Sequence, residues 1–180
     1  MSKFEKLLNV VAIVTGLFVC GTFLVDRLAR LPRSEPRPLV GQKALFTGVA
    51  RAKDRPPNPG PEIALVVSSH CQYCASSMPF HGRLVAISKR NPGRLRILGA
   101  FSLRLDSEGS IGHFFSDAGV VPDAVVPIDF GGTGLSATPT LLGLDRDGVT
   151  GRSWIGKLDA DKENDVLRYI ATSCPDCRLE

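Results

Sequence analysis

The pair Cys71 and Cys74 lies between an apolar segment and a helical one, and this arrangement limits the folds that the chain can adopt. The preceding residues 62–69 read EIALVVSS, an apolar run of strand length. The following residues 71–89 carry apolar side chains at helix-compatible spacing. Two cysteines three residues apart at a helix start place one thiol at the exposed first turn and the other one turn deeper. The sequence therefore predicts a strand, a two-cysteine turn and a helix in direct succession.

This position has a chemical consequence for the two thiols. The unpaired N–H groups and the positive end of the helix dipole favour a thiolate at the first turn. We therefore expect Cys71 to have a lowered pKa and to be the attacking sulfur, and Cys74 to resolve the mixed disulfide. A CxxC pair also occurs as half of a zinc site or as a structural disulfide. Its place between a strand and a helix favours redox chemistry.

The rest of the globular part continues the alternation of strands and helices, which predicts an α/β fold. Residues 39–46 (LVGQKALF) have enough apolar side chains for an edge strand. The turn DRDG predicts a hairpin, in which Gly148 takes a positive φ. The further elements expected are strands over 94–101, 124–128, 140–144 and 150–155, and helices over 110–118 and 159–172.

The N-terminal residues 7–25 contain no charged side chain. As a helix, such a run covers roughly the 30 Å hydrocarbon core of a bilayer. It continues directly into Asp26 and Arg27 without a small-residue cleavage site, so we interpret it as an uncleaved signal-anchor. The predicted organisation is a tail and transmembrane anchor over 1–25, a Pro/Arg-rich stalk over 26–60, a folded domain over 61–173 with an alternative start at 39, and a CPDC tail over 174–180.

The net basic charge of the chain belongs to the stalk. The whole chain has 22 Lys and Arg against 18 Asp and Glu, and a sequence pI near 8.9. Residues 26–60 alone carry eight basic and three acidic side chains, whereas residues 61–180 have an acidic excess. A basic segment beside a membrane anchor is suited to anionic lipid head groups. We therefore expect a lipid membrane as a partner and no nucleic acid.

Two further features carry a resemblance to a known family. The segment CQYCASSMP places Pro79 eight residues after Cys71, and Thr138-Pro139 directly precedes the predicted hairpin. Over about residues 39–173 the sequence resembles the thioredoxin superfamily, and specifically the membrane-anchored TlpA-like and ResA-like thiol-disulfide oxidoreductases of bacteria. The resemblance implies a thioredoxin fold, a central mixed sheet flanked by helices. It also implies a cis bond before Pro139, with Thr138 and Pro139 shaping a substrate groove that faces the cysteines, and chemistry without a cofactor or metal.

The motif also departs from the family pattern. His70 stands where the family usually has Trp, and Ser77 stands where many reductive members carry Glu. A protonated His70 would stabilise the Cys71 thiolate, while the alternative is an exposed loop histidine. His81 and His113 are interpreted as core or surface residues and not as ligands.

A second pair, Cys174 and Cys177, follows the last predicted helix, and it is no general feature of that family. Three interpretations stay open: a structural disulfide or spare pair, a second redox pair that exchanges with Cys71 and Cys74, or half of a four-cysteine zinc site.

The function predicted from these observations is a membrane-anchored thiol-disulfide oxidoreductase. Its partners would be protein thiols and disulfides and a redox donor or acceptor. We expect a single-pass protein of the bacterial inner membrane with its catalytic domain on the periplasmic side, where disulfide chemistry is used. The arginines that follow the span argue for the opposite orientation, although long domains cross largely regardless of charge. The alternative functions are a static thioredoxin-like binding protein with a fixed disulfide or a metal, and a peroxidase, which would not need Cys74.

Overall fold

The computed structural model describes residue 15, residues 40–46 and residues 60–179 of the chain. The chain divides into two compact units, Met1–Glu35 and Pro36–Glu180, and every helix and strand named below belongs to the second. The predicted anchor at 7–25 and most of the predicted stalk at 26–60 lie outside the described residues. Among the residues described, no helix combines the length and apolar character that crossing a bilayer requires.

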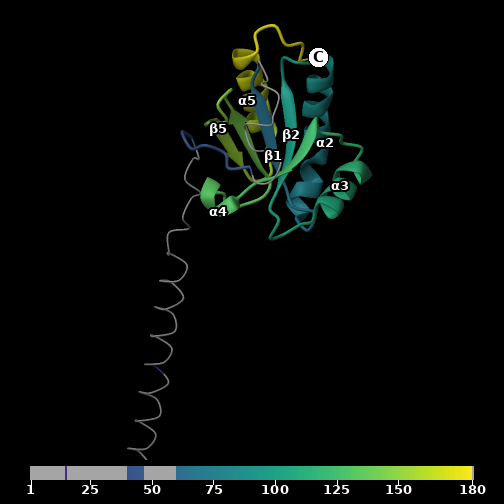
Figure 1. Cartoon of the computed structure of the whole chain (residues 1–180), viewed down its shortest axis with the longest axis vertical. Coiled ribbons are helices and arrows are strands. Elements are labelled where there is room, and N and C mark those ends of the chain that lie inside the picture. Colours follow the sequence, from purple (N-terminus) through teal and green to yellow (C-terminus); the bar gives the residue numbers. More distant parts are fainter. Residues whose placement is uncertain (1–14, 16–39, 47–59, 180) are drawn as a thin grey trace, which may run out of the picture. The chain divides into compact units, whose positions relative to one another are not determined.

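A five-stranded mixed sheet forms the centre of the second unit, with the strand order β3-β2-β1-β4-β5 (Figure 1). Strand β1 (Glu62–Val66) pairs in parallel with β2 (Arg96–Phe101), and β2 pairs in parallel with β3 (Ala124–Pro127). On its other side β1 runs antiparallel to β4 (Thr140–Leu144), which forms a hairpin with β5 (Thr150–Ile155). The predicted α/β class and mixed sheet are thus confirmed.

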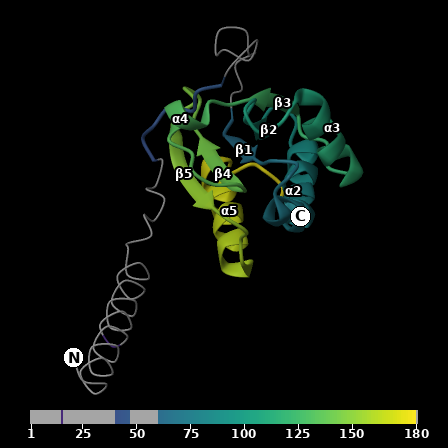
Figure 2. The same ribbon diagram turned by 90° about the horizontal axis from the view of Figure 1, so that it is seen from below.

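Strand β1 is buried on both faces, which explains its unbroken apolar sequence. Alternate side chains point to opposite faces, so Ile63 and Leu65 belong to one hydrophobic cluster and Ala64 and Val66 to another. The first cluster is completed by α2 (Gln72–Arg90), α3 (Glu108–Asp117) and α5 (Ala160–Ser173), and the second by Phe130 of the short α4 (Phe130–Thr133). Figure 2 shows α2 and α5 on one side of the sheet and α4 on the other.

The predicted strand over 39–46 is wrong in its described part. Residues 40–46 make two isolated bridges, in which Lys43 pairs with Val149 and Phe46 with Ile128. Val149 directly precedes β5 and Ile128 directly follows β3, the two edge strands of the sheet. Residues 41–44 share three backbone hydrogen bonds with Gly148 and Thr150, and Phe46 then pairs with Ile128 at the other edge. Neither pairing continues far enough along its neighbour to form a strand.

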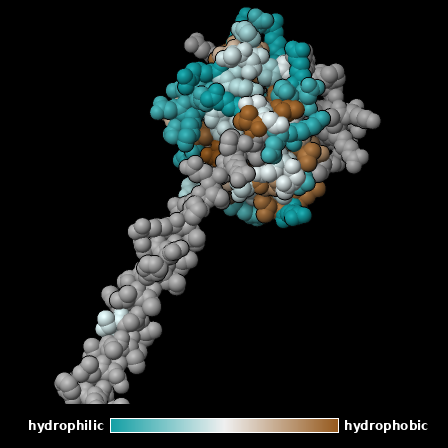
Figure 3. Space-filling model, turned by 90° about the vertical axis from the view of Figure 1, so that its left-hand side faces the viewer, coloured by the Kyte–Doolittle hydropathy of each residue, from teal (hydrophilic) through white to brown (hydrophobic). Residues whose placement is uncertain are grey.

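One face of the folded unit is largely polar. In the view of Figure 3 the hydrophobic residues form small separate groups among hydrophilic ones. The large hydrophobic side chains that are exposed in the described part of the chain are Val40, Leu45, Tyr73, Leu103, Leu105, Val121 and Val125.

Gly143 in β4 lies against an aromatic ring, and we expect its replacement by alanine to destabilise the fold. A Cβ at this position would lie 2.6 Å from two ring carbons of Tyr169, whose ring in turn packs edge-on against Trp154 at a centroid distance of 5.5 Å. The ring cannot retreat without disturbing this pair. Overpacking of this kind costs about 1–3 kcal/mol, so Gly143→Ala should lower the free energy of unfolding in urea by that amount.

The matched control for this substitution is Gly112→Ala. Gly112 is exposed within α3, and a Cβ there meets nothing within 4 Å. Because alanine is the better helix former, the free energy of unfolding of this variant should rise by up to about 1 kcal/mol. Equal effects of the two substitutions would contradict the assigned contact with Tyr169.

Candidate functional site

Cys71 occupies the N-cap of α2, at the turn that follows β1. Its backbone is extended (φ −95°, ψ 110°), and its Sγ accepts the N–H of Cys74 at 3.2 Å. The sulfur therefore takes the place that a serine or aspartate oxygen usually holds at the start of a helix. The apolar run of β1 and the helical periodicity after Cys74 place the turn here, as the sequence predicts.

This environment lowers the pKa of the Cys71 thiol. Partial burial works against ionisation, but the hydrogen bonds with Cys74 and with the Thr138 side chain outweigh it. A thiolate accepts the Cys74 N–H more strongly than a thiol does, so the contact favours the charged form. The lowered pKa expected from the position of Cys71 is confirmed.

Cys74 has the opposite character. Its side chain is fully buried within the main hydrophobic cluster. Burial, and after it the neighbouring Cys71 sulfur, raise the pKa of this thiol to about 12. The Cys71 and Cys74 sulfurs are both free in this structure. One partly exposed thiol that ionises readily thus lies beside one buried thiol that does not.

Thr138 and Pro139 complete the surroundings of Cys71 from a distant part of the chain. The Cys71 Sγ–H donates to the Thr138 carbonyl oxygen at 3.3 Å, and the bond between Thr138 and Pro139 is cis, as predicted. Two contacts hold this loop: the Gly156 N–H donates to the Pro139 carbonyl at 2.8 Å, and the Thr140 hydroxyl donates to the Ala137 carbonyl at 2.8 Å. The fold therefore brings all four residues of the predicted central site together.

The two positions that depart from the family pattern have different surroundings. His70 is exposed, and its N–H donates to the Ser68 hydroxyl at 3.4 Å. Ser77 is buried on α2 and its hydroxyl donates to the Tyr73 carbonyl at 2.8 Å, so it offers no acid or base at this position. A role for His70 beside the thiolate stays a prediction.

The sequence analysis assigns His81 and His113 to the core or the surface. In the structure His81 is buried and His113 is exposed on α3. His81 is 1% exposed on α2, and burial lowers its pKa to about 4. Its Nδ1 has no hydrogen-bond partner among the residues that the structure describes. The side chain lines a cavity of about 60 Å³ between α2, β4 and α5. Neutral histidine is therefore part of the core behind the site.

Asp106 is the residue of this region that the sequence analysis missed. It lies in the loop after β2 and is buried, and one of its carboxylate oxygens accepts both the backbone N–H and the hydroxyl of Ser69. An aspartate between an apolar strand and a helix start indicates turn chemistry in any sequence. Only the parallel pairing of β1 with β2 brings it beside the cysteine loop.

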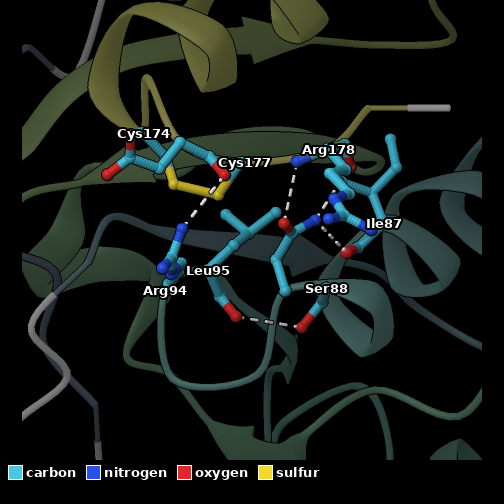
Figure 4. The surroundings of a disulfide bond; sticks show 9 residues. Ile87, Ser88, Arg94, Leu95, Cys174, Cys177 and Arg178 are labelled. Atoms are coloured by element: carbon cyan, nitrogen blue, oxygen red, sulfur yellow. Dashed lines mark hydrogen bonds between the residues drawn. A yellow bond between two sulfur atoms is a disulfide. The ribbon is translucent and has the colours of Figure 1, made fainter.

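The second cysteine pair forms a disulfide at the end of α5, with 5.3 Å between the Cα atoms of Cys174 and Cys177 (Figure 4). Beyond it the tail turns back onto the end of α2. The Asn91 side-chain amide donates to the Arg178 carbonyl, and its oxygen accepts the Arg178 N–H, each at 2.8 Å. Arg94 also donates to the Asp176 carbonyl at 3.2 Å. The disulfide therefore lies at the C-terminal end of α2, whereas Cys71 caps its N-terminal end.

The described ranges hold no group of three or more histidine, cysteine or acidic residues arranged to bind a metal ion.

The mixed sheet, the cysteines at the start of α2 and the cis-proline beside them define the class of structure: the chain has the thioredoxin fold. The likeness predicted from its motifs is thus confirmed at the level of the fold. No family model and no curated protein sequence matches the chain. The similarity to solved structures is clear, although sequence identity is low.

Three of these structures show how widely the likeness extends. A candidate protein disulfide isomerase from Bacteroides thetaiotaomicron has a TM-score of 0.58 at 14% identity, with 76% of this chain and 91% of that chain covered. A thiol-disulfide isomerase from Corynebacterium glutamicum has a TM-score of 0.52 at 16% identity, with 78% and 97% covered. The exposed lipoprotein thioredoxin Etrx1 from Streptococcus pneumoniae has a TM-score of 0.50 at 17% identity, with 73% and 98% covered.

Proposed function

We propose that this protein is a thiol-disulfide oxidoreductase that exchanges disulfides with other proteins through Cys71 and Cys74. The observation that carries the proposal is the contrast between the two thiols. The accessible Cys71 has a lowered pKa at a helix N-terminus, and the buried Cys74 has a pKa raised to about 12. Two-step disulfide exchange requires such a pair, in which one thiol attacks the substrate and the other resolves the mixed disulfide.

The exchange proceeds in two balanced steps. The Cys71 thiolate attacks one sulfur of a substrate disulfide, which forms a mixed disulfide with Cys71 and releases the other substrate sulfur as a thiolate. Cys74 then loses its proton and attacks the Cys71 sulfur, forming the Cys71–Cys74 disulfide and releasing the second substrate thiolate. The substrate gains two electrons and the protein loses them, and the reverse sequence oxidises a substrate dithiol.

The Cys74 thiol becomes easier to ionise within the mixed disulfide. Burial raises its pKa most, but the Cys71 sulfur contributes through both a hydrogen bond and its charge. Once Cys71 is bonded to the substrate, it carries no charge and this contribution is removed. Formation of the mixed disulfide therefore makes Cys74 easier to ionise for the second step.

Proteins are the substrate class that the surroundings of Cys71 suit. Tyr73, between the cysteines, is 63% exposed, and Leu103 and Leu105 in the neighbouring loop are 60% and 52% exposed. Apolar side chains left in solvent beside a reactive sulfur favour contact with a partner surface. In this proposal the Thr138 carbonyl, which contacts the Cys71 sulfur, and the cis-proline loop also shape the approach to Cys71.

We further propose that residues 7–25 tether the protein to a bacterial inner membrane and that the folded unit works on the periplasmic side. The uncharged run at 7–25 and the basic residues at 26–60 support the tether. Two observations support the oxidising side: the redox-type cysteine pair and the Cys174–Cys177 disulfide, since disulfides persist in oxidising compartments.

We assign a structural role to Cys174 and Cys177. The two cysteine pairs lie at opposite ends of α2, whose 19 residues span roughly 28 Å, so sulfurs of one molecule do not meet. Cys174 also caps the C-terminus of α5, where the helix dipole disfavours a thiolate. This pair therefore serves to hold the tail turn that docks on Asn91 and Arg94.

Redox titration of the full-length protein tests both assignments. The protein is equilibrated in a series of thiol-disulfide buffers and alkylated, and free cysteines are mapped by mass. We expect Cys71 and Cys74 to convert together as a reversible two-electron couple. Because the lowered pKa of Cys71 stabilises the reduced form, this couple should be reduced under milder conditions than Cys174 and Cys177.

A Cys71–Cys74 pair that stays locked throughout the titration would favour a static thioredoxin-like binding protein instead. A pair protected from alkylation until a chelator is added would favour a metal site. Conversion of all four cysteines at one midpoint would contradict the structural role of the second pair.

A further inference from the structure

The loop that delivers Cys71 to the start of α2 is held from outside by one side chain. Residues 68–71 form a tight turn in which the Cys71 N–H donates to the Ser68 carbonyl at 3.2 Å. Within this turn, Ser69 directs both its donors to a single carboxylate oxygen, Oδ1 of Asp106. The Ser69 N–H is 3.0 Å from that oxygen, and the Ser69 hydroxyl donates to it as well.

Asp106 is itself fixed by the loop after β2. Its N–H donates to the Ser102 carbonyl at 2.9 Å, and the Leu105 N–H donates to the same oxygen at 3.0 Å. The Arg104 N–H donates to the Ser102 hydroxyl at 3.3 Å. Asp106 is 7% exposed, so its hydrogen bonds are shielded from competing water. The hydrogen-bonded loop that follows β2 thus supports the cysteine turn that follows the neighbouring strand β1.

The function of Cys71 depends on the geometry of this turn. Its sulfur accepts the Cys74 N–H only while Cys71 stays at the N-cap with an extended backbone. Ser69 lies two residues before Cys71, so a shift of the turn displaces the sulfur relative to the helix N–H groups. We propose that Asp106 is a positioning residue, which holds the turn through Ser69 in the geometry where the Cys71 sulfur accepts the Cys74 N–H. This inference rests on the proposed function only for its effect on turnover.

Substitution of Asp106 by asparagine distinguishes a positioning role from an acid-base role. Oδ2 is buried without a hydrogen-bond partner in the described part of the chain. Asparagine keeps an acceptor at Oδ1 but has neither the charge nor the proton affinity of the carboxylate. If Asp106 acts by position, asparagine should therefore replace it and alanine should not.

Asp123, which is exposed, provides a control that makes the same two kinds of contact. Its Oδ2 accepts the Ser88 hydroxyl and the Ile97 N–H, each at 2.6 Å, so it also holds one hydroxyl and one backbone donor. Ser88 belongs to the last turns of α2, at the opposite end of the helix from Cys71. Asp123→Ala should destabilise the fold by the same mechanism without touching the cysteine turn.

The experiment measures the rate at which iodoacetamide alkylates Cys71, as a function of pH, in the full-length reduced protein, with the labelled cysteine identified by mass. We expect Asp106→Ala to slow alkylation at pH 7 by about three- to tenfold and to move the pH profile upward, because the thiolate loses its helix N–H. Asp106→Asn should stay within about twofold of the wild type, and Asp123→Ala should leave the rate unchanged.

Equal effects of Asp106→Asn and Asp106→Ala would overturn the proposal in favour of a charge or proton-transfer role. Slowing by Asp123→Ala to the same extent would overturn it in favour of general destabilisation. If Asp106→Ala does not fold, Ser69→Ala carries the test, since it removes the hydroxyl bond alone: a slower rate supports the proposal and an unchanged rate refutes it. Because alkylation needs no substrate, wild-type protein without turnover would refute the proposed function and leave this result standing.

Discussion

Replacement of Cys71 by serine should abolish the reduction of a protein disulfide substrate, such as insulin in the presence of dithiothreitol, beyond the background rate. A serine hydroxyl does not ionise near neutral pH, whereas the pKa of Cys71 is lowered, despite partial burial, by hydrogen bonds with Cys74 and with the Thr138 side chain. Loss of a nucleophile typically costs at least about a thousandfold in rate. The measurement is the catalysed rate over the dithiothreitol background in the full-length variant.

Cys74→Ser should fail at a different step. The Cys71 thiolate still attacks the substrate disulfide, but no second thiol releases the product, so a covalent complex with substrate accumulates. It should be visible on a non-reducing gel and should disappear after reduction. Because Cys74 lies in the hydrophobic core, its variant must be shown to unfold cooperatively before the trapped complex is interpreted.

The double variant Cys174→Ser/Cys177→Ser is the control for both experiments. Its disulfide lies at the far end of α2, so turnover should be retained while stability falls. Closing so short a loop contributes on the order of 2 kcal/mol in the chain-entropy model. Full activity of Cys71→Ser, or loss of activity in the tail variant, would contradict the assignment of the two pairs.

Acid should destabilise the fold through His81 by about 3 kcal/mol. Burial lowers the pKa of His81 from 6.5 to about 4, so the native state holds the neutral imidazole. The unfolded chain takes up the proton near its ordinary pKa, and it therefore binds more protons than the native state at pH values below about 6.5. Stability contributed by the neutral form is fully present above that value, declines as the pH falls, and is lost below about pH 4.

Urea unfolding of the wild type and of His81→Phe at pH 7.5 and pH 3.5 measures the stability that the neutral form of His81 contributes. Phenylalanine has a similar shape, carries no titratable group and removes the unpartnered Nδ1, and the adjoining cavity of about 60 Å³ leaves room for it. Between the two pH values the free energy of unfolding of the variant should fall by about 3 kcal/mol less than that of the wild type. The carboxylates titrate in both proteins, so their contribution cancels.

His113→Phe is the matched control, because His113 is exposed on α3. The same two measurements on this variant show the effect of removing a histidine from the surface. A His81 variant as acid-sensitive as the wild type would show that the cavity lined by Lys157 and Glu163 admits enough water to accommodate a charged imidazole.

Local sequence patterns were sufficient to predict the order of the elements other than the short helix α4, and the centre of the site. The apolar run that became β1, the helical spacing after Cys74 and the DRDG turn of the hairpin are all signals within a few residues of each other. The position of Cys71 at a helix start is equally local, because the N-cap is determined by where the strand ends and the helix begins. The cis bond before Pro139 was expected from the family likeness of the motif.

Contacts between distant segments required the tertiary structure. Residues 40–46 have the composition of a strand, but they pair beside β5 and β3 too briefly to form one. Ser69 and Asp106 each carry an ordinary turn signal, and only the pairing of β1 with β2 joins them. The burial of His81 and the docking of the C-terminal tail on Asn91 have the same origin.

Hydrophobic period, capping and turn preferences act over one or two turns of chain, so they were enough to predict the α/β class and the two-cysteine chemistry. The tertiary structure alone decided what supports the reactive sulfur and what is buried behind it. Those features depend on which strands become neighbours, and that choice is made by the collective burial of the two faces of the sheet.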